Sequence, residues 1–167
     1  MSVTDKFLDF AEKYGKYENI PENVIHEVKM TLLNGIGNAL AGIASDKGKI
    51  GVAMAHELGG REEATLIGVG GKVSAAAAAF ANAELLNGLD GDPIPHIPPT
   101  VLPSILAVGE KEKISGKELL AALTVGQEVA LRLVSIFGMQ MIISYMKYNK
   151  TPDIFSNSNE SIIGAAV

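Results

Sequence analysis

The sequence contains no cysteine and no tryptophan, and aromatic residues make up only 5% of it. Without cysteine there can be no disulfide, no thiolate-bound iron–sulfur cluster and no cysteine nucleophile, and the commonest ligand of structural zinc is missing. A cytoplasmic protein is therefore expected. Because bulky rings are scarce, the core has to be built from Leu, Ile, Val, Met and Ala.

Positive charge is also scarce. Arg61 and Arg132 are the only arginines, the lysines are scattered, and the formal net charge is −5. A nucleic-acid surface needs clustered Lys and Arg to neutralise phosphates, so no nucleic-acid partner is expected. The mixed, charged character of the first residues leads us to expect no signal peptide. The longest nearly apolar run, residues 133–146, is shorter than the roughly 20 residues that span a bilayer. No membrane partner is expected either.

What the sequence does contain is a succession of helical patterns. With 167 residues, of which 47% are hydrophobic, the chain is large enough to form one domain with its own core. We predict an all-α fold, a multi-helix bundle with at most a short extended segment near residues 64–67. The predicted helices cover residues 4–14, 21–43, 50–58, 75–87 and 101–111, and a last helix begins after residue 115.

Short polar residues and glycines predict where these helices begin and end. Thr4, Ser74 and Ser115 can each accept a hydrogen bond at a helix N-terminus, and Ser115 forms a capping box with Glu118. Gly59-Gly60 predicts the end of the third helix. A proline-rich loop is expected over residues 88–99.

The helix predicted for residues 21–43 has Gly35, Gly37 and Gly42 in its interior. Each glycine costs roughly 1 kcal/mol relative to alanine. We therefore expect a neighbouring helix to approach this backbone closely. The apolar face of the helix is predicted to contain Val24, Val28, Leu32, Ile36, Leu40 and Ile43.

The C-terminal residues suggest an interrupted element. The apolar segment 162–167 follows the polar stretch 156–160 and resembles a buried helix that stops after its first turns. We expect the chain to be a truncated portion of a larger architecture. The alternative is an apolar tail that docks on its own domain.

Several short motifs occur in an order that is specific as a set. They are residues 20–24 with the following helix to 41–42, 63–68, 72–75, 79–82, 89–92 with His96, 101–103, 119–123 and 128–130. This series resembles the N-terminal, helical part of the 2-methylcitrate dehydratase (MmgE/PrpD) family. The resemblance covers nearly all of this chain but only the first part of a typical member.

The resemblance implies a function. Members of that family are cofactor-independent enzymes that act on small di- and tricarboxylates, as 2-methylcitrate dehydratases, cis-aconitate decarboxylases or iminodisuccinate epimerases. Lyase-type acid–base chemistry next to a carboxylate is therefore expected, with no cofactor, no metal and a homodimeric assembly. Residues 1–167 would form a single helical domain of a two-domain architecture. The exact substrate and reaction stay open.

The resemblance also implies catalytic residues in the proline-rich loop. Asp90 and His96 match the family's Asp and His by position, and Asp92 lies between them. An imidazole suits proton transfer near neutral pH, and a nearby carboxylate can orient it. Prolines 93, 95, 98 and 99 would hold this loop semi-rigid. The alternative is an ordinary surface turn, Asp-Gly-Asp-Pro, beside a solvated histidine.

Three further residues are predicted to bind substrate. Asn82 lies in the Ala-Asn segment, where bracing a helix is an equal alternative, and Lys72 lies just before a helix start that favours anions. The alternative for Lys72 is a solvated surface side chain. Asn87 stands where members often have a histidine; it can form hydrogen bonds but cannot shuttle protons near neutral pH.

Other departures from the family favour weak activity. Phe155 or Ser156 occupies the place of a second catalytic histidine, and the family's catalytic lysine would lie beyond residue 167. Since one acid–base group typically contributes about 10²- to 10⁴-fold in rate, we expect little turnover of 2-methylcitrate by this chain alone. The opposing hypothesis is a non-catalytic helical assembly module.

Two other kinds of site are disfavoured. Asp90-x-Asp92 lacks the glutamate that an EF-hand needs at its last position, where Val101 stands. Gly68-x-Gly70 lacks the third glycine of a dinucleotide-binding turn.

Overall fold

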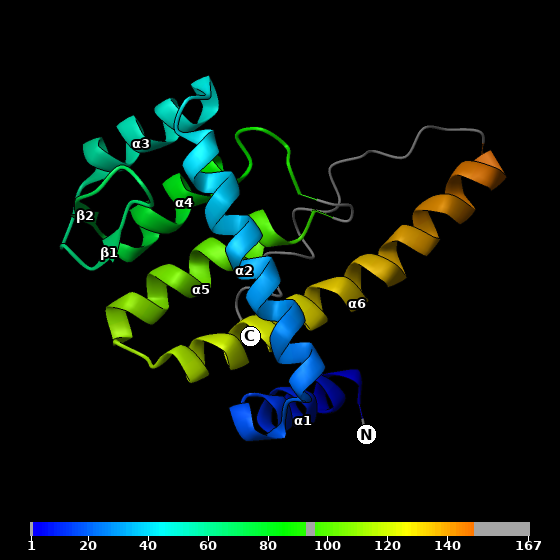
Figure 1. Cartoon of the computed structure of the whole chain (residues 1–167). Coiled ribbons are helices and arrows are strands. Elements are labelled where there is room, and N and C mark those ends of the chain that lie inside the picture. Colours follow the sequence, from blue (N-terminus) through cyan, green and yellow to red (C-terminus); the bar gives the residue numbers. More distant parts are fainter. Residues whose placement is uncertain (1, 93–95, 149–167) are drawn as a thin grey trace.

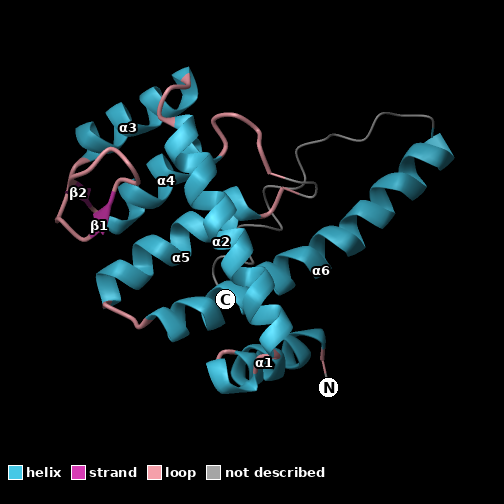
Figure 2. Cartoon of the chain, viewed as in Figure 1, coloured by secondary structure: helices cyan, strands magenta, loops and turns pink. Residues whose placement is uncertain are grey.

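The computed structural model describes residues 2–92 and 96–148, and within residues 136–148 only the course of the helix. Its elements are α1 (Val3–Tyr14), the 3₁₀ helix η1 (Tyr17–Asn19), α2 (Glu22–Gly42), α3 (Asp46–Leu58), β1 (Ala64–Thr65), β2 (Lys72–Val73), α4 (Ala75–Leu86), α5 (Pro98–Glu112) and α6 (Gly116–Tyr148). Helices dominate, with one small pair of strands (Figure 2). The predicted mainly α bundle is therefore confirmed.

Helix α4 is the centre of the bundle. It packs against α2, α3 and α5. Helix α6 in turn packs against α5 and α2 (Figure 1). The face that α4 turns to the core is rich in alanine, and Ala78 and Ala81 have no exposed surface. Small side chains allow neighbouring helix axes to come close, because helix separation depends on the side chains at the contact.

Two of the three glycines in α2 mark such close approaches, as expected. A Cβ on Gly35 would collide with the side chain of Leu102, and one on Gly42 would collide with the backbone carbonyl of Leu85. Gly37, in contrast, has open space around its Cα. The prediction of helix contact is thus confirmed for Gly35 and Gly42 and wrong for Gly37.

The predicted apolar face of α2 is partly wrong. Its buried residues are Ile25, Val28, Gly35, Ala39 and Gly42, whereas Leu40 is 50% exposed. The small residues occupy the core side because α4 and α5 lie so close to it. The Leu40 side chain lies instead against the glycine turn that follows β1.

The extended segment predicted for residues 64–67 is shorter than expected. Only β1 is extended, and it pairs antiparallel with β2, which the sequence analysis did not predict. Between the strands, Gly68, Gly70 and Gly71 have φ angles of 72°, 84° and 79°. Glycine adopts such left-handed conformations readily, so this motif serves as the turn of a hairpin.

Helix starts were predicted with mixed success. Ser74 and Ser115 accept the expected capping hydrogen bonds. Ser2, and not Thr4, caps α1, because Asp5 completes a capping box with it. Helix α3 begins at Asp46, with Ser45 as its cap, and not at Ile50.

Helix α5 begins inside the predicted loop. Pro98 and Pro99 form its first turn, where their missing N–H groups leave no hydrogen bond unmade. The loop predicted for residues 88–99 is therefore two residues shorter than expected. The buried residues of α5, among them Val101 and Leu102, then join the core.

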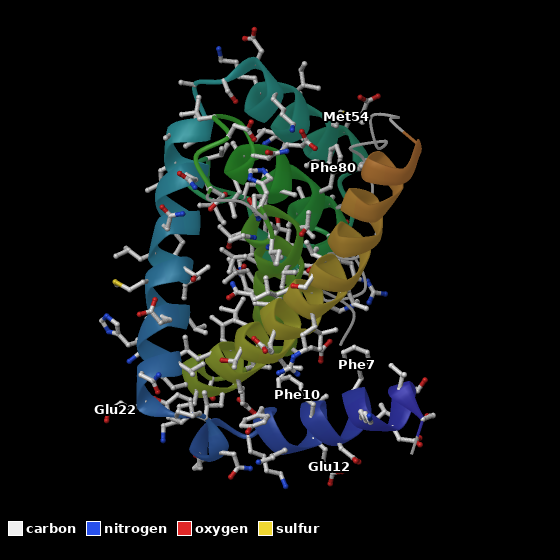
Figure 3. The ribbon with its side chains drawn as sticks, turned by 90° about the vertical axis from the view of Figure 1, so that its right-hand side faces the viewer. Phe7, Phe10, Glu12, Glu22, Met54 and Phe80 are labelled. Carbon is white, nitrogen blue, oxygen red and sulfur yellow. The ribbon has the colours of Figure 1, made fainter. Side chains whose placement is uncertain are left out.

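Helix α1 lies across the bundle at the side of α6. Phe7 and Phe10 point toward the rest of the molecule and Glu12 points away from it (Figure 3). The guanidinium carbon of Arg132 lies 4.7 Å from the centre of the Phe10 ring, which is a cation–π distance.

Two sequence-based expectations concern other parts of the chain. The interrupted apolar segment 162–167 and the position of Phe155 or Ser156 lie outside the described residues. In the part that is described, none of the helices combines the length and the apolar character that crossing a membrane requires.

The contrast between Gly42 and Gly37 can be tested by substitution with alanine. Gly42→Ala should lower the free energy of unfolding by about 1–3 kcal/mol, because the new methyl group meets backbone that cannot move aside. Gly37→Ala should raise it by roughly 0.5–1 kcal/mol through better helix propensity alone. Urea unfolding at constant m-value measures both. A Gly42→Ala protein as stable as the parent would contradict the packing described here.

Candidate functional site

The candidate site is the loop that joins α4 to α5, which we call the α4–α5 loop (residues 87–97). It starts at Asn87, the C-cap of α4, and ends at Ile97, the residue before α5. Residues 93–95, which include two of the four prolines predicted to stiffen it, lie outside the described residues.

The loop follows α2 backward from its C-terminal end. A Cβ on Gly88 would touch Gly42 and Ser45, and a Cβ on Gly91 would meet the side-chain amide of Asn38. One residue further, the Asn34 amide donates a hydrogen bond to Asp92. Successive loop residues therefore contact successive turns of α2, which fixes the path of the loop up to Asp92.

The structure brings Asp90, Asn87 and His96 together. Nε2 of His96 lies 2.7 Å from Oδ1 of Asn87 and 3.4 Å from Oδ1 of Asp90. The His96 side chain is 29% exposed and the Asp90 side chain 86% exposed. The imidazole and the carboxylate that the sequence analysis paired are thus neighbours, at the surface and open to solvent.

The backbone at both ends of this contact is unusual. Asp90 and His96 have φ angles of 56° and 63°, in the left-handed region. Non-glycine residues pay about 1–2 kcal/mol to adopt this conformation, which occurs often at functional sites. The strain is tolerated here at the two residues whose side chains meet.

Asp92 has a different environment. Only 8% of its surface is exposed, and Oδ1 accepts a hydrogen bond from Nδ2 of Asn34 at 2.9 Å. Burial raises the pKa of Asp92, and the nearby carboxylate of Asp90 raises it further. Asn38, His96 and Asn34 lower the pKa, but the effect of burial is larger and the net shift is upward. Nδ2 of Asn38 and Oδ2 of Asp92 are both shielded from solvent, and neither forms a hydrogen bond with a described residue, so the bonded partner of Asp92 is Asn34.

The two aspartates therefore differ in what they can do. Asp90 is exposed beside His96, while Asp92 is buried and holds the loop to α2. Asn34 and Asn38 were not predicted from the sequence. Their signal was an Asn-x-x-x-Asn spacing in a glycine-rich helix, because asparagine is a poor helix former and residues four apart share a face.

Asn82 does not lie in this loop. It is 2% exposed, its Oδ1 accepts from the N–H of Ile67 and its Nδ2 donates to the carbonyl of Thr65, both at 2.9 Å. Both ends of the amide are thus bonded to the backbone of β1 and the residues after it. These contacts are those of a brace between α4 and the hairpin.

Lys72 lies at the other end of α4 from Asp90. Helix α4 has 12 residues, so its ends are about 18 Å apart. Nζ of Lys72 lies 2.7 Å from Oε1 of Glu110. The same oxygen accepts from the hydroxyl of Thr65, and Oε2 accepts from the N–H of Thr65. Burial alone would raise the pKa of Glu110, but these hydrogen bonds outweigh it and lower the pKa. The predicted residues therefore fall into two groups, with Lys72 and Asn82 at the hairpin.

Two cavities lie near these groups. One is an open cleft of about 630 Å³ between α1, α2 and α6 that reaches Ile97 and Pro98, directly after His96. One of about 340 Å³ is lined by Asn82, Thr65 and Glu110 among mainly apolar residues. The larger volume is in the range of small-molecule sites. Neither cavity is lined by Asp90, Asp92 or His96, and of the described residues of the α4–α5 loop only Ile97 lines the larger one.

The charges at the larger cavity are largely paired. Its arginine, Arg132, lies 2.7 Å from Oε1 of Glu128. Over residues 2–92 and 96–148, the structure contains no group of three or more His, Asp or Glu side chains that could hold a metal ion.

Residues 5–146 match the family model described as the MmgE/PrpD N-terminal domain. No curated protein and no solved structure matched the chain.

The bracing role of Asn82 predicts a loss of stability. Asn82→Ala should lower the free energy of unfolding by about 1–3 kcal/mol or more, because it leaves the N–H of Ile67 and the carbonyl of Thr65 without their partner. Chemical denaturation measures the loss. The exposed Asn23 on α2 supplies the matched control, and Asn23→Ala should change stability by no more than about 0.5 kcal/mol. Equal stability of the two variants would rule out the brace.

The environment of Asp92 predicts a pH-dependent effect. Its pKa in the folded chain lies above the ordinary value of 3.8, so the native state binds more protons than the unfolded state between the two values. Its ionisation therefore costs stability as the pH rises through that window. Asp92→Asn should remove this cost and stabilise the chain near neutral pH relative to the parent, with the difference shrinking as the pH falls through this window and absent below the ordinary value.

Unfolding free energies measured across this pH range test the assignment. The exposed Asp9 on α1 is the control, since Asp9→Asn should shift stability by no more than about 0.5 kcal/mol at any of these pH values. A destabilising effect of Asp92→Asn that grows toward neutral pH would show that the charged form is the favoured one.

Proposed function

The chain belongs to the MmgE/PrpD family, and from this premise we propose that its α4–α5 loop takes part in lyase-type acid–base chemistry on a small di- or tricarboxylate. The observation that carries the proposal is the contact of the His96 imidazole with Asn87 at 2.7 Å and Asp90 at 3.4 Å. We propose His96 as the group that exchanges a proton with substrate and Asp90 as the carboxylate beside it.

The chemistry follows from the imidazole. His96 takes the proton from a carbon next to a substrate carboxylate, and the electron pair of that C–H bond forms a carbon–carbon double bond. The C–O bond to the neighbouring hydroxyl breaks, and the leaving oxygen takes the proton from the His96 imidazolium, so that water leaves and the neutral imidazole is regenerated. Asp90 stabilises the imidazolium that forms, because an opposite charge within a few ångströms favours the charged form. In an epimerase the proton would instead return to the other face of the same carbon.

Substrates of the proposed class need positively charged side chains to bind their carboxylates, and this chain has few that are available. Polyacids are anchored by Lys and Arg, which bind carboxylates through charge-assisted hydrogen bonds. Lys72 is paired with Glu110, and Arg132 with Glu128. This supports the proposal that the chain by itself turns over substrate poorly. A cytoplasmic location, the absence of a cofactor and a single-domain organisation belong to the same proposal.

A second candidate is a non-catalytic helical assembly module. The observation that favours it is the outer face of α2, where Met30, Leu33 and Leu40 are 43%, 63% and 50% exposed and Gly37 is open. Exposed apolar side chains in a row are typical of surfaces that pack against a partner. The proposed homodimer would be consistent with this face and with either function.

Thermal unfolding with and without small acids separates the two candidates. If the site is retained, citrate, 2-methylcitrate or cis-aconitate should raise the Tm, because a ligand of the native state stabilises it by mass action. At 100 times its Kd a ligand adds about 2.7 kcal/mol, which in a chain of this size amounts to roughly 5–10 °C.

Histidine variants provide the control. His96→Asn should abolish the rise, while His56→Asn, at an exposed position on α3, should leave it intact. Sulfate at matched ionic strength accounts for general anion effects. The absence of any acid-specific rise would favour the assembly module and reject the proposed chemistry for this chain.

A further inference from the structure

Two acceptors converge on a single ring nitrogen of His96. Oδ1 of Asn87 and Oδ1 of Asp90 both face Nε2, at 2.7 Å and 3.4 Å. A neutral imidazole carries one proton, and the nitrogen that bears it is set by its hydrogen-bond partners. Two oxygens around Nε2 stabilise a proton there.

The carboxylate also fixes which way the Asn87 amide is turned. If its NH₂ group faced the ring, Nε2 would have to be the bare nitrogen, and its lone pair would then lie opposite the oxygen of Asp90. That repulsion is absent when Nε2 carries the proton and the Asn87 oxygen accepts it. The orientation with Oδ1 toward the ring is therefore the one that avoids this repulsion.

Asn87 is the better anchored of the two acceptors. Its N–H donates to the carbonyls of Ala83 and Leu85 at the end of α4, and it directly follows Leu86, which has no exposed surface. Asp90, in contrast, has an 86% exposed side chain. An acceptor held on a helix end loses little entropy when the hydrogen bond forms, whereas an exposed carboxylate competes with water.

We infer that Asn87 is a positioning residue that keeps the ring proton of His96 on Nε2, so that Nδ1 is the atom that takes the proton from substrate. This inference rests on the proposed function, since it assigns the reacting atom of the same histidine. It replaces substrate binding, the role predicted for Asn87 from the sequence.

Nuclear magnetic resonance can read the ring nitrogens directly. In ¹⁵N-labelled chain, long-range ¹H–¹⁵N correlations resolve the three histidines, at about pH 8, where an ordinary imidazole is neutral. We expect His96 to have a bare Nδ1 and a protonated Nε2 whose proton exchanges slowly with water. His26 and His56, both exposed, serve as internal references.

Variants separate the two acceptors. Asn87→Leu should shift His96 toward the tautomer mixture of the exposed histidines and speed exchange of its Nε2 proton roughly tenfold, on the scale of one lost hydrogen bond. Asn87→Asp keeps an acceptor oxygen and should restore the parent pattern. Asp90→Ala removes the carboxylate that turns the Asn87 oxygen toward the ring, so it should shift the tautomer in the same direction as Asn87→Leu but by less, because the Asn87 amide can still accept the proton.

The inference is overturned if parent His96 carries its proton on Nδ1, or if Asn87→Leu leaves the His96 signals as they were. The first of these tests uses the unaltered chain, so it holds even if Asn87→Leu fails to fold. Since no substrate is present, the result is independent of the proposed function. A correct tautomer without ligand-induced stabilisation would reject the reaction and leave the role of Asn87 intact.

Discussion

The close approach of α2 and α4 is the constraint on which the rest of the structure depends. Gly42 has no side chain where the carbonyl of Leu85 passes, and Gly88 fits against the same turn of α2. These contacts fix the end of α4, so they also fix Asn87 and the start of the α4–α5 loop. A bulky residue at either glycine would separate the two helices and move the origin of the loop.

From that origin the loop is attached to α2 turn by turn. Gly91 passes the Asn38 amide and Asp92 accepts from Asn34, so the loop is held along its described part. Two carboxylates separated by one residue thereby reach opposite environments. Asp92 is buried with a raised pKa, and Asp90 remains in solvent beside the imidazole. Burial, not sequence position, separates their roles.

Much of the architecture could be predicted from local chemistry. Ser74 before an alanine run, and Ser115 with Glu118, identify helix starts because their hydrogen bonds involve only neighbours in the chain. The predictions were wrong where contacts between residues far apart in the sequence determine the structure. The spacing of Leu40 predicted that it lies on the buried face of α2. Glycine and alanine occupy that face instead, because the neighbouring helices pack too close to it for a larger side chain. Strand β2 was missed because two residues have no periodicity, and only pairing with β1 makes them extended.

The candidate site shows the same division. The sequence by itself determined which groups are present, a histidine six residues after an aspartate between two helices, because the family motif and the chemistry of imidazole can be recognised without coordinates. Only the tertiary structure decided that Asp90 and Asn87 meet the same nitrogen of His96, that Asp92 faces α2, and that Asn82 and Lys72 belong to the hairpin at the other end of α4. Contacts of this kind depend on the path of the backbone through space, and that path is set by how closely α2 and α4 pack.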